Sequence, residues 1–196
     1  IRDPLVSSIW KDLGMLVSRG NFSNLYINDR YWGIYNVRES INEHFIKDNT
    51  GYLDFDLIRY LKWNTELKHG SIDAWNEINT FIRTRDFSNN QNYLDAKNKI
   101  DIETFLNLQA LIICSEYRSW TWGASVYKEQ SSSSKWKWTI WDMDRAFTNV
   151  NWNGFTILDD TTGLYKPNIF ANRLLKNDQF RFQFINRVAD FLNSIF

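Results

Sequence analysis

The stretch WKWTIWDMDRAF, residues 136–147, determines much of what the sequence predicts about the fold. Side chains alternate between the two faces of a strand, so Trp136 and Trp138 share one apolar face with the isoleucine that follows them. If the extended conformation continues, Asp142 and Asp144 project from that same face, roughly 7 Å apart. The stretch therefore predicts a buried strand that ends in two neighbouring carboxylates.

These carboxylates have two interpretations. Neighbouring carboxylates repel each other and raise each other's pKa unless a positive charge lies between them. A hard cation such as Mg²⁺ supplies that charge and binds oxygen ligands, with phosphate oxygens completing its shell. In the alternative, Asp142 caps a turn or helix and Asp144 pairs with Arg145 or another surface cation. The Asp-x-Asp spacing is too short and too common to choose between the two.

Composition limits the class of protein. The length of 196 residues predicts a single domain, residues 1–196, and the start at Ile1 indicates an excised or N-terminally truncated part of a longer chain. The 23 Lys and Arg residues balance the 23 Asp and Glu residues, which argues against nucleic-acid binding. No apolar run is long enough to span a membrane. The single cysteine, Cys114, excludes an internal disulfide, and we expect a buried, inert thiol.

The aromatic content is high, with 10 Trp, 9 Tyr and 14 Phe residues. Aromatic side chains either fill a large core or line a platform for sugar rings or bases. Trp120, Trp122 and Trp152 fall in predicted loops, where exposed rings would stack on sugars. An extracellular carbohydrate-binding domain is therefore one hypothesis, and core packing of the tryptophans is its alternative.

The order of elements predicts an α+β architecture. Asp3, Asp73 and Asp101 are expected helix caps, and the Asn28-Asp29-Arg30 sequence is expected to form the turn of a hairpin over residues 24–39. A second hairpin, with the serine run 131–134 at its tip, leads to the two acids. We expect helices over residues 3–14, 40–49, 73–86, 101–118 and, as a pair broken near residue 177, 167–196, with a polar helix or loop over residues 89–99.

A buried helix, a loop, a hairpin and an acid at the strand end follow one another in the C-lobe of protein kinases. There the loop carries a catalytic Asp and a metal-binding Asn, and the acid after the second strand holds Mg²⁺. The early hairpin, which leads to Arg38 and Glu39, would then be the last part of the N-lobe and enter the interlobe linker.

Three motifs occur in the order in which the CotH family of atypical protein kinases has them. They are LYINDRYWGIYNVRESINEHF (residues 25–45), DIETFLNLQALI (residues 101–112) and WKWTIWDMDRAF, and with them the chain resembles that family over roughly residues 3–150. The resemblance implies an atypical protein-kinase-like fold, mainly the helical C-lobe with two β-hairpins and an incomplete N-lobe.

The resemblance also implies an activity, which is Mg-ATP-dependent phosphoryl transfer to Ser or Thr of a protein substrate. The implied cofactors are ATP and Mg²⁺ or Mn²⁺, with Asp142 and Asp144 as metal ligands. Arg38 and Glu39 would be linker residues near the adenine, with a surface ion pair as the alternative. Members of the family include spore-coat, surface and secreted bacterial proteins, so a location at the bacterial surface or outside the cell is expected.

The loop after the buried helix departs from the family pattern. It has the sequence RSWTWGAS, residues 118–125, with Ser119 where the catalytic Asp is expected. A serine cannot accept a proton from a substrate hydroxyl as a carboxylate does. Gly123 and Ala124 have no side chain that coordinates a cation. The alternative functions are therefore a catalytically impaired pseudokinase, a structural or binding module that contacts a surface protein, or the glycan-binding domain.

Overall fold

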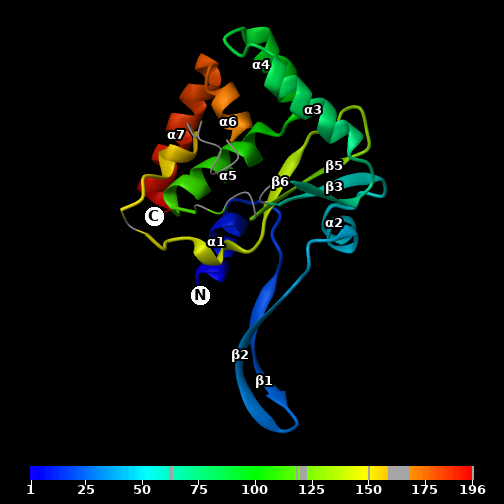
Figure 1. The fold of residues 1–196 in the computed structure, drawn as a ribbon, viewed down its shortest axis with the longest axis vertical. Coiled ribbons are helices and arrows are strands. Elements are labelled where there is room, and N and C mark those ends of the chain that lie inside the picture. Colours follow the sequence, from blue (N-terminus) through cyan, green and yellow to red (C-terminus); the bar gives the residue numbers. More distant parts are fainter. Residues whose placement is uncertain (62–63, 118, 120–122, 150, 159–167, 196) are drawn as a thin grey trace.

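The computed structural model describes residues 1–61, 64–117, 119, 123–149, 151–158 and 168–195. Helices surround a small antiparallel sheet, and a long two-stranded hairpin projects away from this body (Figure 1). The described helices are α1 (Arg2–Asp12), α2 (Glu43–Thr50), α3 (Asp73–Thr84), α4 (Asn90–Lys99), α5 (Ile102–Cys114), α6 (Ile169–Leu174) and α7 (Asp178–Ser194). The described strands are β1 (Gly20–Ile27), β2 (Arg30–Arg38), β3 (Phe55–Tyr60), β4 (Thr65–His69), β5 (Ala124–Glu129) and β6 (Lys137–Ile140). The α+β prediction is confirmed.

Helix α5 is the centre of the body, as its apolar sequence predicts. The Asp101 side chain caps it by accepting a hydrogen bond from the Thr104 N–H at 2.9 Å. Ten consecutive residues of the helix, 104–113, are buried. Helix α5 packs between the sheet and α7, which places its carboxyl end beside the end of β6 (Figure 1).

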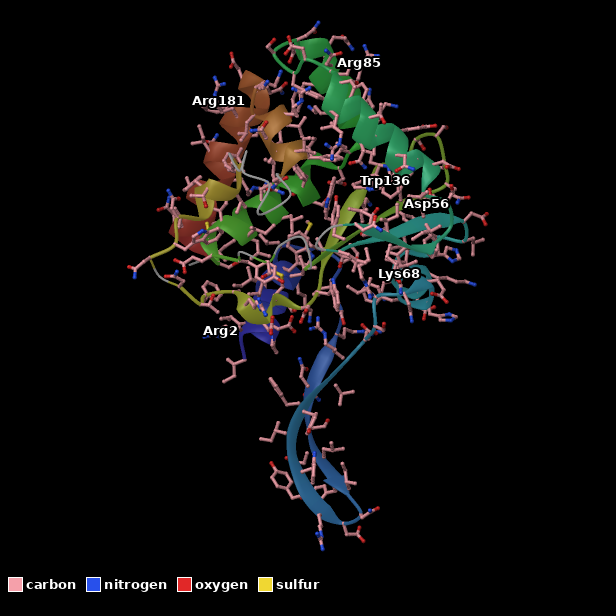
Figure 2. The ribbon with its side chains drawn as sticks, viewed as in Figure 1. Arg2, Asp56, Lys68, Arg85, Trp136 and Arg181 are labelled. Atoms are coloured by element: carbon pink, nitrogen blue, oxygen red, sulfur yellow. The ribbon has the colours of Figure 1, made fainter. Side chains whose placement is uncertain are left out.

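The sheet has the strand order β4-β3-β5-β6 and is antiparallel throughout. The β5–β6 hairpin is the one expected around the serine run. Strands β3 and β4 occupy residues 51–70, for which the sequence pattern predicted no element, because β3 is buried on both faces and lacks alternation. Trp136 lies in the interior between sheet and helices, with its ring 5.0 Å from that of Trp75 in α3 (Figure 2).

The β1–β2 hairpin forms as predicted and is longer than expected. Asn28 and Asp29 have φ angles of 49° and 62°, which suits the tight turns that match the twist of a hairpin. Side chains project from both sides of the hairpin into solvent (Figure 2), and Trp32 and Ile34 are 63% and 66% exposed. An isolated two-stranded hairpin is only marginally stable in water. Its position therefore depends on contacts at its root.

Three local predictions need correction. Asp3 is not a helix cap, because α1 begins at Arg2 and makes no side-chain cap hydrogen bond. Asp73 is likewise inside α3, whose cap residue is Ile72. The helical spacing of the last helix predicts one core-facing side that carries Leu192 together with Phe180, Phe184, Val188 and Phe191. The four other residues are buried, but Leu192 is 59% exposed and does not face the core.

Gly70 and Gly14 allow a matched test of packing. Both have positive φ, 77° and 75°, so an alanine at either position costs about 1 kcal/mol of backbone strain. A Cβ at Gly14 would meet open space, whereas one at Gly70 would lie 2.3 Å from the Phe55 carbonyl and 2.4 Å from the Asp56 carboxylate. We expect Gly70→Ala to lower the free energy of unfolding by about 1–3 kcal/mol more than Gly14→Ala does in urea denaturation. Equal losses of unfolding free energy in the two variants would show that the backbone around Phe55 and Asp56 moves aside without an energetic cost.

Candidate functional site

The two predicted acids lie in a turn, not in a continued strand. Strand β6 ends at Ile140, and Asp142 adopts the left-handed conformation with φ 55° and ψ 44°. A 3-10 turn, η1 (Met143–Arg145), follows at once. The expectation that Asp142 and Asp144 continue the face of the strand is therefore wrong. We call residues 142–144 the acidic turn.

The peptide unit between Asp142 and Met143 is held at both ends. The Tyr117 hydroxyl donates a hydrogen bond to the Asp142 carbonyl at 2.8 Å, and the Met143 N–H donates one to the Asp3 carboxylate at 2.7 Å. The Met143 side chain is buried. Aspartate enters the left-handed region more readily than most residues, so these bonds stabilise a conformation that the residue type tolerates.

The side chains of Asp142 and Asp144 are both exposed. Partial burial and the negative charges of Asp144 and Asp3 raise the pKa of Asp142, while Arg38 and Arg145 oppose that rise. Within the described ranges neither acid forms an ion pair, and Asp142 makes no side-chain cap. The hydrogen-bonded cap and the ion pair of the alternative interpretation are therefore not formed among the described residues.

The acidic turn fits a cation that brings most of its own ligands. Across the part of the chain that the structure describes, no group of three His, Cys, Asp or Glu side chains is placed to hold a metal. Mg²⁺ commonly takes one or two protein carboxylates, with water and phosphate oxygens completing its octahedron. Two exposed carboxylates match that number of protein ligands. They could not enclose a cation by themselves, so water and phosphate oxygens would supply the remaining ligands.

Arg38 and Glu39 lie at the hairpin root, and both form ion pairs. Arg38, at the end of β2, pairs with the largely buried carboxylate of Asp3. Glu39 pairs with Arg19 and accepts a hydrogen bond from the Arg19 backbone N–H at 2.8 Å. The pair of Glu39 matches the surface ion pair given as the alternative, whereas that of Arg38 is largely buried. The two pairs attach the end of β2 to α1 and to the residue before β1.

A cleft of about 340 Å³ lies between α1 and the hairpin root. Polar side chains dominate its lining, and Asp3, Arg38 and Lys11 contribute charges of both signs. Asp3 lines this cleft and also accepts the hydrogen bond from the Met143 N–H, so the cleft lies next to the acidic turn. No local sequence pattern indicates this cleft, because its walls come from α1 and from the β1–β2 hairpin.

The loop after α5 contains the position of the expected catalytic Asp. Ser119 is half-buried in a turn, and Arg118, Trp120 and Trp122 lie outside the described residues. Gly123 is explained by packing, since a Cβ there would lie 2.6 Å from the Tyr117 ring and 3.0 Å from the Met143 sulfur. A larger residue at this position would displace Tyr117, whose hydroxyl holds the acidic turn.

A second cavity, of about 310 Å³, has an aromatic floor. Trp75 stacks on Phe170 with centroids 5.5 Å apart, and Trp138 completes the floor beneath a rim that includes Asn76 and Asn79. None of the predicted site residues lines it. The sequence pattern predicts Trp138 as a core residue, and Asn76 and Asn79 on α3 are the available signal of a cavity beside it.

Of the three tryptophans expected to bind sugars, only Trp152 lies among the described residues. Trp152 is half-buried and packs against the main core, so core packing holds for this residue. Cys114 is also only partly buried, and burial raises the pKa of its thiol to about 11. The thiol is therefore protonated at neutral pH, as expected of an unreactive cysteine.

The Arg19–Glu39 pair predicts a pH dependence at the hairpin root. Hydrogen bonding from Arg19 holds the pKa of Glu39 below its usual value of 4.5. The pair therefore contributes its full stabilisation of the folded state above pH 4.5, and this stabilisation is lost as the pH falls through the lowered pKa of Glu39. We expect the Glu39 carboxyl carbon to titrate below pH 4.5 in NMR, and Arg19→Gln to return the midpoint to the usual value. An unchanged midpoint in Arg19→Gln would contradict the pairing.

Comparison with known proteins places the chain in a family. The family described as CotH kinase protein matches residues 1–196, the whole chain. No curated protein matches the sequence. Among the described helices, none is both long and apolar enough to cross a membrane. With its ordered motifs, its α+β body and its acidic turn after β6, the chain belongs to the CotH kinase protein family.

Proposed function

We propose that this kinase-like domain binds ATP with Mg²⁺ or Mn²⁺ at the acidic turn and transfers the terminal phosphoryl group to Ser or Thr of a protein. The observation that carries the proposal is the pair of exposed carboxylates on a turn fixed by Tyr117 and Asp3. The negative charges that raise the pKa of Asp142 would be neutralised by a divalent cation. Family membership supports the same chemistry.

Asp142 and Asp144 would hold the cation, which when bound neutralises phosphate charge during transfer. Arg38 and Glu39, held by their ion pairs at the hairpin root, would lie near the adenine of the nucleotide. A location at the bacterial surface or outside the cell, with surface proteins as substrates, completes the proposal.

The second candidate is a pseudokinase that binds the nucleotide without efficient transfer. Ser119 favours it, because the residue offers no carboxylate to orient or deprotonate an acceptor hydroxyl. Glycan binding through Trp152 is the less favoured alternative, since that half-buried ring packs against the core. Glycan binding elsewhere on the chain remains a prediction.

Removing one carboxylate tests the metal site. Asp142→Asn keeps the size of the side chain and tolerates the left-handed conformation but removes the charge. We expect at least a tenfold loss of affinity for Mg-ATP in calorimetric titration, because even residues behind metal ligands typically contribute about 10–100-fold. The matched control is Asp190→Asn, which changes an exposed carboxylate on α7. Equal affinities in Asp142→Asn and the parent would remove Asp142 from the site.

Restoring the missing carboxylate separates kinase from pseudokinase. Ser119→Asp supplies a group able to accept the hydroxyl proton, and general-base catalysis contributes about 10²–10⁴-fold. We expect phosphate transfer to a generic protein substrate to rise by about 100-fold while Mg-ATP affinity stays unchanged. Fast transfer by the parent chain, with no gain in Ser119→Asp, would show that another residue carries this role.

A further inference from the structure

The carboxylate of Asp3 joins two parts of the site that are far apart in the sequence. One oxygen accepts the Met143 N–H hydrogen bond at 2.7 Å, across 140 positions of sequence. The other pairs with Arg38 at the end of β2, across 35 positions. The Asp3 side chain is 11% exposed and that of Arg38 is 25% exposed. A carboxylate in helix α1 thus bridges the acidic turn and the hairpin root.

The bond to Met143 controls the direction of Asp142. Its donor belongs to the peptide unit whose carbonyl accepts the Tyr117 hydroxyl bond. Together the two bonds fix ψ of Asp142 and φ of Met143, and so the left-handed conformation that sets where the Asp142 carboxylate points. A hydrogen bond to a charged acceptor is about twice as strong as one between neutral groups.

The bond to Arg38 makes this control depend on the hairpin. If the hairpin root moved away, Asp3 would keep a largely buried charge without its cation, which is strongly unfavourable. Glu39, the next residue, holds the opposite strand through Arg19. The docked hairpin and the ordered acidic turn are therefore stabilised together.

We propose that Asp3 is a positioning residue that couples docking of the β1–β2 hairpin to the conformation of the acidic turn. A ligand that contacts the hairpin root would then strengthen cation binding at the turn, and a bound cation would favour the docked hairpin to the same degree. The cation part of this inference rests on the proposed function, whereas the coupling through Asp3 does not.

Variants of Asp3 and Arg38 separate the two bonds. Asp3→Asn keeps an oxygen acceptor for the Met143 N–H but weakens the attraction to Arg38, and Asp3→Ala removes both. Arg38→Gln leaves the carboxylate and removes its cation. The matched control is Glu43→Gln, which changes an exposed first-turn carboxylate of α2.

The first readout is hydrogen exchange of the Met143 amide by NMR, which needs no ligand. We expect exchange at least about tenfold faster in Asp3→Ala and Arg38→Gln, a smaller increase in Asp3→Asn, whose neutral amide oxygen still accepts the Met143 N–H bond, and no change in Glu43→Gln. Unchanged Met143 exchange in Arg38→Gln, with its fold intact by circular dichroism, would overturn the coupling. Should Asp3→Ala fail to fold, Asp3→Asn and Arg38→Gln still decide the outcome.

The second readout is Mn²⁺ affinity from water-proton relaxation. If only charge mattered, removing the positive charge of Arg38 would strengthen binding of Mn²⁺ at the acidic turn, because less repulsion would oppose the cation. If Arg38 acts by holding the conformation of the turn through Asp3, its removal weakens Mn²⁺ binding. We expect Arg38→Gln to bind Mn²⁺ more weakly than the parent, and stronger binding would overturn the inference. Absence of Mn²⁺ binding by the parent would refute the proposed metal site, and the Met143 exchange would then decide the coupling alone.

Discussion

The peptide unit between Asp142 and Met143 is the constraint on which the candidate site depends. Its carbonyl is bound by Tyr117, which follows α5, and its N–H by Asp3 in α1. The buried helix, the first helix and the end of β6 therefore converge on one peptide plane. Gly123 belongs to the same arrangement, because the absence of its side chain leaves room for the Tyr117 ring. Polar bonds to a backbone unit thus determine where two exposed carboxylates point.

Local chemistry in the sequence predicted most of the elements correctly. The Asp101 cap, the Asn28-Asp29 turn and the alternation around Trp136 depend on neighbours within a few residues, so each is visible without a structure. Asp3 shows the opposite case. It stands before Pro4 as a cap would, yet its partners lie 35 and 140 positions away. No local pattern distinguishes a capping aspartate from one that bonds to a distant backbone amide.

The same limit explains the acidic turn. Extended geometry was the simplest continuation of β6, and it predicted two carboxylates on one face. The left-handed residue breaks that continuation, and it is stabilised by tertiary bonds that the sequence pattern does not contain. The predicted repulsion between the two acids is still present in the turn, because the charge of Asp144 contributes to the raised pKa of Asp142. The sequence motif identified the two acids, whereas contacts with α1 and Tyr117 determine how they are arranged.

Holding a cation and deprotonating an acceptor are separable tasks, and the proposed function requires different residues for them. Phosphoryl transfer depends mainly on positioning and charge neutralisation, and little covalent chemistry is required of the protein. The residues suited to those tasks, Asp142 and Asp144, are fixed by the fold, whereas Ser119 lacks the carboxylate of a catalytic base. Gly123, in the same loop, packs closely against Tyr117 and leaves no room for a side chain. The contacts among the described residues fix the geometry of the acidic turn. Nucleotide and metal binding is therefore the part of the proposed activity that they support most directly.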